Sequence, residues 1–170
     1  GDTAVMMKGC GIDALIIEGA SETPVYIYVT DKTAEVRDAS HIWGKGNRET
    51  TALITKETEA GVNVVSIGQS GENLVNLSCV ITGIAHCGGA GTGRIMGQKK
   101  CKAIAFYGTQ GMQVADAKKV QELNNYVMSD LIGSNNNHVI PTVMQSWSEY
   151  SNKSSRWTGH PGLMWGAAEG

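Results

Sequence analysis

Residues 24–29 read Pro-Val-Tyr-Ile-Tyr-Val, and residues 33–38 read Thr-Ala-Glu-Val-Arg-Asp, with Asp31-Lys32 between them. The first run is aromatic and β-branched, a composition that suits a strand. The second run alternates polar and apolar residues, as a strand with one face on the core does. Two such runs joined by turn residues predict a β-hairpin. The first part of the chain is therefore expected to be built on a β-sheet.

Three other short apolar runs, each bounded by turn residues, predict buried strands at residues 13–19, 62–67 and 102–108. A further extended segment is expected over residues 74–81. A helix is expected at about residues 49–58, with Asn47 as its N-cap. Leu53 and Ile54 supply the apolar face of this helix.

The pattern changes in the C-terminal part of the chain. Asp116 is expected to cap a helix whose apolar residues recur at spacings of three and four, namely Val120, Leu123, Val127 and Leu131. A second helix is expected over residues 141–150, after a break rich in asparagine at residues 133–137. We therefore expect a β-rich domain over residues 1–112 and the start of a helical domain over residues 113–170.

The composition is that of a globular protein, with 41% hydrophobic and 18% charged residues among 170. The formal net charge of −2 gives no electrostatic reason to expect nucleic acid or an anionic membrane surface as a partner. No run approaches the roughly 20 apolar residues of a membrane-spanning helix. The opening residues Gly1-Asp2-Thr3 lack the features of a signal peptide. We expect a cytoplasmic protein and a chain cut from a longer one.

The four cysteines are Cys10, Cys79, Cys87 and Cys101. Because no pair has C-x-x-C spacing, the sequence shows no zinc or iron–sulfur ligand set. We expect Cys10, Cys79 and Cys101 to be small buried hydrophobic residues.

Residues 86–97 form a glycine-rich bend that reads His-Cys-Gly-Gly-Ala-Gly-Thr-Gly-Arg-Ile-Met-Gly. Glycines let backbone N–H groups converge and approach an anion closely, and a helix starting near Thr92 would add its positive end. Arg94 can grip a phosphate through two hydrogen bonds. The pattern matches neither of the common glycine-rich phosphate-binding motifs. The bend is therefore interpreted as a phosphate cradle or, alternatively, as a tight turn between packed strands.

The remaining candidates are weaker. The turn at residues 67–75 contains Glu72-Asn73, which could orient a ligand or only stabilise the turn. His41 beside Trp43 suggests a packed, hydrogen-bonded pair. Lys8 is either a surface lysine or a phosphate contact. A basic cluster of Lys99, Lys100 and Lys102 is interpreted as largely solvated. His138 and His160 are expected in solvated loops, and no residue is assigned as a catalytic acid or base.

Five segments together resemble the aldehyde ferredoxin oxidoreductase family, in matching order and at near-matching spacing: residues 11–19, 24–28, 37–45, 67–75 and 91–99. The resemblance implies an α+β fold in which two packed β-sheets form the base for a tungsten (or molybdenum) bis-pterin, followed by helices. It also implies oxygen-sensitive oxidation of aldehydes to carboxylic acids, or the reverse. Electrons would pass to a 4Fe–4S cluster and then to ferredoxin or another electron-transfer subunit.

The resemblance also assigns residues to the cofactor. The pterin phosphates would be held by Lys8 and by residues of the bend, namely His86, Cys87, Gly88, Gly89, Ala90, Gly91, Thr92, Gly93 and Arg94. The backbone carbonyl of His86 would bind a bridging magnesium ion. Two arginines of the family are replaced here by Ala85 and Gly89, and Arg94 stands where the family has a small residue. The cluster ligands and catalytic acids would lie outside this chain.

Two alternatives stay open. One is a divergent branch that reduces another substrate, such as an aromatic acyl-thioester. The other is a scaffold or electron-transfer relative without catalysis, which the replacement of both arginines favours. For an aldehyde oxidoreductase, the expected partners are a small aldehyde or related substrate and ferredoxin or another electron-transfer subunit. An oligomer is also expected.

Overall fold

The computed structural model describes residues 2–83, 85–88, 90–111, 114–127 and 129. The chain divides into two compact units, before and after residue 112, and each is described by itself. No helix in the described part of the chain is long and apolar enough to cross a membrane. The helix expected over residues 141–150, together with His138 and His160, lies outside the described residues.

The first unit contains a mixed β-sheet with the strand order β2-β1-β6-β3-β4-β5. Only β1 and β6 run parallel, and the other neighbouring pairs are antiparallel. The strands are β1 (Val25–Thr30), β2 (Ala34–Asp38), β3 (Asn63–Ser66), β4 (Val80–Thr82), β5 (Ala85–Cys87) and β6 (Cys101–Tyr107). The expected α+β class is confirmed. The resemblance implied two packed sheets, whereas all the described strands lie in one sheet.

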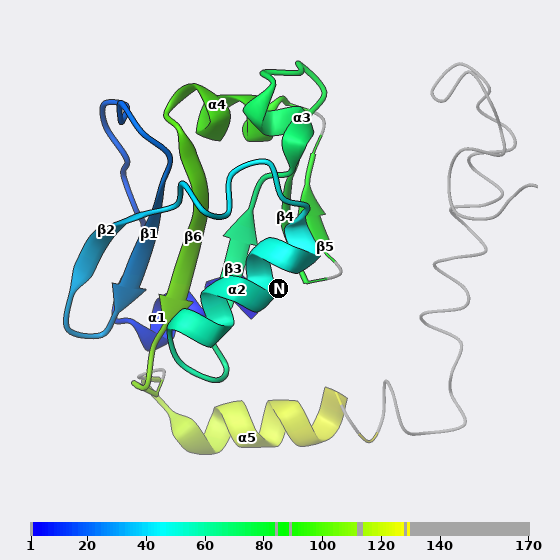
Figure 1. Cartoon of the computed structure of the whole chain (residues 1–170). Helices are drawn as coiled ribbons and strands as arrows, with labels where there is room; N and C mark the ends of the chain where they lie inside the picture. Colours follow the sequence, from blue (N-terminus) through cyan, green and yellow to red (C-terminus); the bar gives the residue numbers. More distant parts are fainter. Residues whose placement is uncertain (1, 84, 89, 112–113, 128, 130–170) are drawn as a thin grey trace, which may run out of the picture. The chain divides into compact units, whose positions relative to one another are not determined.

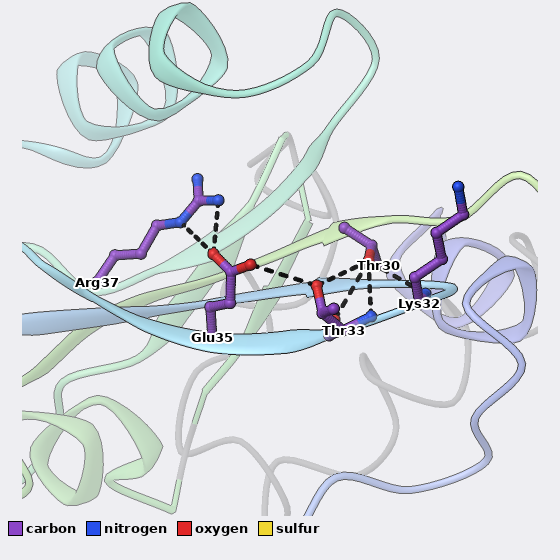
Figure 2. A network of polar contacts seen from close by, with 5 residues as sticks. All are labelled: Thr30, Lys32, Thr33, Glu35 and Arg37. Atoms are coloured by element: carbon purple, nitrogen blue, oxygen red, sulfur yellow. Dashed lines mark hydrogen bonds and ion pairs between the residues drawn. The ribbon is translucent and has the colours of Figure 1, made fainter.

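The predicted hairpin is confirmed as β1 and β2, which pair from Val25 opposite Asp38 onward. Its turn is closed by Thr30, whose hydroxyl accepts from the amides of Lys32 and Thr33 at 3.2 and 3.0 Å (Figure 2). Farther along β2, the Glu35 carboxylate accepts two bonds from Arg37, at 2.9 and 2.7 Å. This polar surface suits an edge strand, because exposed charges discourage pairing with another chain.

Both faces of the sheet are covered, since residues alternate between two apolar clusters along β1, β3 and β6. Helix α2 (Asn47–Glu57) covers one face and helix α1 (Asp2–Gly9) the other (Figure 1). The α2 face buries Tyr26, Tyr28, Ala39, Ile42, Ile54, Val62, Val64, Ala103 and Ala105. The α1 face buries Cys10, Val29 and Phe106, with Met6, Met7, Ile12, Leu15, Ile27, Val65 and Ile104 packed against them.

Two expected extended segments differ from the structure. Residues 13–19 form no strand, and Ile16 is 84% exposed. This run lies between two glycines with positive φ and only packs Leu15 under the α1 face. Residues 74–81 begin as a turn after helix α3 (Gln69–Glu72), with Leu74 at φ 58°, and become extended only at β4.

The expected helix at residues 49–58 is α2, but Asn47 does not cap it. Gly46 occupies the N-cap position, and the Asn47 amide instead donates to Ser66 Oγ and to the Ser66 carbonyl, at 3.0 and 2.9 Å. In the second unit, helix α5 (Ala117–Tyr126) is capped as expected. The Asp116 carboxylate accepts from the Lys119 amide at 3.1 Å.

Candidate functional site

The glycine-rich bend begins in edge strand β5 and ends in helix α4 (Thr92–Gln98). His86 and Cys87 lie in β5, and both are exposed, as are Gly88 and Ala90. Helix α4 starts at Thr92, the position at which the phosphate-cradle interpretation considered a helix start. The described residues of the first part of the bend are therefore accessible to a ligand from solvent.

The later glycines of the bend are buried against neighbouring backbone. A Cβ at Gly91 would lie 2.7 Å from the Asn76 carbonyl oxygen, and one at Gly93 would lie 2.8 Å from that of Cys79. Gly91 also has φ 68°, which L side chains rarely adopt. These contacts seat the start of α4 directly on residues 76–79, so its amides have a defined position.

Hydrogen bonds fix the same turn. The Gly93 amide donates to the Ser78 carbonyl at 3.1 Å, and the Thr92 hydroxyl donates to the Cys87 carbonyl at 2.7 Å. The Gly93 amide is therefore occupied within the fold. A ligand at the bend would be met by the exposed backbone before Gly91 and by the side chain of Arg94.

Arg94 is exposed on the first turn of α4. Its Nη1 donates to Asn76 Oδ1 at 2.6 Å, which holds the guanidinium close to the bend. A guanidinium has five N–H donors, so the bond to Asn76 leaves others for an anion. Arg94 is thus a positioned cation beside an open, glycine-rich turn.

The structure does not bring Lys8 to the bend. Lys8 forms an exposed ion pair with Asp13, and the adjacent Gly9 packs against Gly108, just after the end of β6. Helix α4 precedes the opposite end of the same strand (Figure 1). A strand of seven residues spans roughly 20 Å. The phosphate contact predicted for Lys8 stays a prediction that this separation does not favour.

A buried ion pair joins Lys102 on β6 to Glu72 at the end of α3. The two side chains are 0% and 5% exposed. Lys102 Nζ also donates to the Lys45 carbonyl at 2.7 Å, and the Glu72 carboxylate accepts from the Gly44 amide at 2.9 and 3.0 Å. The sequence interpretation took at least two of the three lysines of the basic cluster as solvated, and Lys102 is the buried one. The signal available in the sequence was a lysine inside an apolar strand.

His41 also contacts carboxylates, as its Nε2 lies 2.7 Å from Glu57 Oε1 and its Nδ1 lies 3.8 Å from Asp38 Oδ2. A hydrogen bond from the Ser40 hydroxyl holds the pKa of Asp38 below its usual value. The side chains of all three groups are at least partly exposed, and they tie the loop after β2 to α2. Among the described residues, no group of three or more His, Cys, Asp or Glu side chains is placed to hold a metal ion.

Comparison with known proteins gives consistent results. Residues 1–108 match the sequence profile described as the N-terminal domain of aldehyde ferredoxin oxidoreductase. The chain is 45% identical over 130 residues to the tungsten-containing aldehyde ferredoxin oxidoreductase of Thermococcus kodakarensis, covering 73% of this chain and 22% of that one. The Pyrococcus furiosus protein of the same name is 44% identical over 130 residues, which again cover 73% of this chain and 22% of that one.

A solved structure is similar as well. It is the active-site complex of benzoyl coenzyme A reductase with 1,5-dienoyl-CoA, at a TM-score of 0.70 and 37% identity. The match covers 73% of this chain and 19% of that one. The chain spans about a fifth of the length of the curated relatives it matches.

Proposed function

The chain belongs to the aldehyde ferredoxin oxidoreductase family, and on that premise we propose that it forms part of the base for a tungsten (or molybdenum) bis-pterin cofactor. When bound, such a cofactor supplies the two-electron redox chemistry, while the protein supplies position and electrostatics. The part played by this chain is to hold the phosphates of the pterin at the glycine-rich bend.

The observation that carries this proposal is the position of Arg94. Arg94 is exposed, its guanidinium donates to Asn76, and it lies one turn after Gly91, the N-cap of α4. The exposed main chain at Gly88 and Ala90 can be approached closely, because neither residue has a side chain larger than a methyl group. The residues present therefore suit a phosphate group.

The proposed site is less basic than that of the family as the resemblance describes it. Ala85 lies exposed in β5, where the family has an arginine. Arg94 supplies a guanidinium from the other side of the bend, on α4. A magnesium ion at the His86 carbonyl, on the exposed edge strand β5, belongs to the same proposal and would offset phosphate charge that the missing arginines leave.

For the whole protein we propose oxidation of aldehydes to carboxylic acids, or the reverse. Electrons would pass to a 4Fe–4S cluster and on to ferredoxin or another electron-transfer subunit. The cluster ligands and the catalytic acids belong to parts of the protein outside this chain. The names of the relatives in Thermococcus and Pyrococcus support the tungsten-dependent reaction of aldehydes. A cytoplasmic, oxygen-sensitive oligomer is part of the same proposal.

A second candidate is reduction of an aromatic acyl-thioester, and the similarity to benzoyl coenzyme A reductase favours it. Assaying the protein in its natural length with aldehydes and with aromatic acyl-thioesters separates the two reactions. A preparation with neither tungsten, molybdenum nor extractable pterin would instead favour a scaffold without catalysis.

The cradle itself is tested by Arg94→Ala in the protein of natural length. We expect tungsten (or molybdenum) per chain to fall several-fold, since a charge-assisted bidentate contact to phosphate is lost. The measurement is elemental analysis of the purified protein. Arg48→Ala is the matched control, because Arg48 is also an exposed arginine near the start of a helix but lies on α2. Unchanged metal content in the Arg94 variant would reject the role of Arg94.

A further inference from the structure

The buried ion pair of Lys102 and Glu72 joins three segments that are far apart in the sequence. Lys102 lies on β6, Glu72 ends α3, and both contact the loop before α2 through the Lys45 carbonyl and the Gly44 amide. The Lys102 carbonyl also accepts from the Ile67 amide at 3.0 Å, just before α3. Helix α3 is thereby tied to the central strand at both of its ends.

Helix α3 in turn touches α4 through glycines, and the two helices lie next to each other at the end of the sheet where β6 begins (Figure 1). A Cβ at Gly97 would lie 2.0 Å from the carbonyl oxygen of Gly71, the residue immediately before Glu72. A Cβ at Gly71 would lie 3.0 Å from the Gly93 carbonyl oxygen. With backbone against backbone, α3 cannot shift without moving α4.

A buried ion pair is a poor source of net stability, because desolvation of both charges offsets their attraction. Its geometry is nevertheless demanding, since an unpaired charge in the interior is strongly unfavourable. Lys102 and Glu72 therefore penalise any arrangement in which α3 leaves its place on β6. No ligand is needed to account for this pair, and neither side chain reaches the surface of the bend.

We propose that the Lys102–Glu72 ion pair is a positioning device that fixes α3, and through the glycine contacts fixes the start of α4 at the glycine-rich bend. The inference rests on the proposed function insofar as the bend receives the cofactor phosphates. Lys102 and Glu72 act through α4 and touch no cofactor themselves.

The test compares three variants of the protein of natural length. Lys102→Met leaves the Glu72 carboxylate buried without its cation, and we expect the melting temperature to fall by about 5 °C or more. Glu72→Gln with Lys102→Met removes both charges and keeps an amide oxygen to accept from the Gly44 amide, so most of the melting temperature should return. Lys45→Met is the matched control, because it breaks a solvent-accessible lysine ion pair between the same loop and Glu49 in the first turn of α2.

Amide hydrogen exchange and tungsten content are then measured on the double variant, which guards against a simple failure to fold. Exchange in α4 at least about tenfold faster than in the wild type, together with reduced tungsten, supports a positioning role. Wild-type exchange in α4 with full tungsten content overturns it. If the wild type itself holds no tungsten, molybdenum or pterin, the proposed function fails, and hydrogen exchange alone decides whether the ion pair positions α4.

Discussion

Gly88 and Gly97 lie in the same glycine-rich bend, yet a methyl group would meet very different surroundings at the two positions. At Gly88 it would lie 3.3 Å from the Cys79 Cβ, on an exposed part of the chain. At Gly97 it would lie 2.0 Å from the backbone oxygen of Gly71. Gly91, Gly93 and Gly97 thus serve helix packing, whereas Gly88 leaves main chain accessible. A count of glycines in the sequence does not separate these two uses.

Among substitutions that test this difference between the glycines, Gly97→Ala should have the largest effect on stability. Because the clashing atom belongs to backbone, α3 and α4 must move apart, and we expect the free energy of unfolding to fall by about 3 kcal/mol or more. Denaturant unfolding measures the change. Gly111→Ala is the control, since a Cβ there has nothing within 4 Å, and it should change stability by less than about 1 kcal/mol. Equal stability of the two variants would contradict the packing described for α4.

An intermediate effect is expected from pH, because Cys87 in the exposed part of the bend and Cys101 just after the bend have different surroundings. Cys87 is exposed, whereas burial raises the pKa of the Cys101 thiol from 9.0 to about 11. Between these values the unfolded chain loses the Cys101 proton and the folded chain keeps it, so stability falls as the pH rises. This contribution amounts to at most about 3 kcal/mol, since one pKa unit is about 1.4 kcal/mol.

The measurement is unfolding at several values between pH 8 and pH 11, about the range over which a thiol with a raised pKa titrates. Cys101→Ala should have a shallower decline than the wild type, and Cys87→Ala should keep the wild-type slope. Burial also raises the pKa values of Cys10 and Tyr28, so these groups contribute to the pH dependence as well. The difference in slope between the wild type and Cys101→Ala gives the contribution of Cys101. Identical slopes for all three proteins would show that Cys101 is not shielded from water.

The smallest effect is expected for Gly88→Ala. Its Cβ would meet the side chain of Cys79 at 3.3 Å and the His86 ring at an ordinary contact distance of 3.5 Å. A shift of a few tenths of an ångström is therefore enough, and stability should change by less than about 1 kcal/mol. If exposed backbone at Gly88 approaches the phosphates, the added methyl group lowers tungsten content while leaving the melting temperature unchanged. A loss of stability as large as that of Gly97→Ala would show that both halves of the bend are packed alike.

Much of the fold was predictable because the evidence for it is local. The hairpin, β3, β6 and the Asp116 cap follow from alternation, apolar runs and capping chemistry within a few residues. The run at residues 13–19 has the same local pattern, but it pairs with no strand of the described sheet. Asn47 had the right chemistry for a cap, and a partner 19 residues away, Ser66, took its side chain instead.

The bend could be found from its glycines, but the parts that hold it in place could not. Lys102 reads as one more residue of a basic cluster until its partner, 30 residues earlier, is known. Asn76 lies 18 residues before Arg94 and has no feature that would link the two. Sequence motifs therefore located the candidate surface, while its supports depend on long-range contacts that no short pattern records. That residues 1–112 and 113–170 are a pterin-base domain and the start of a helical domain stays a prediction.

The parallel pairing of β1 with β6 has a consequence for the order of assembly. In the described sheet, β6 lies between the β1–β2 hairpin and the β3–β4–β5 meander, and it is the last of these strands to leave the ribosome. Until residue 107 has been made, the two sub-sheets lack the strand that joins them, and their inner edges have unpaired backbone groups. Closure must then wait for contacts of long sequence separation, which are slow to form. A nascent chain halted near residue 100 is therefore the species most exposed to edge-to-edge aggregation and to capture by chaperones.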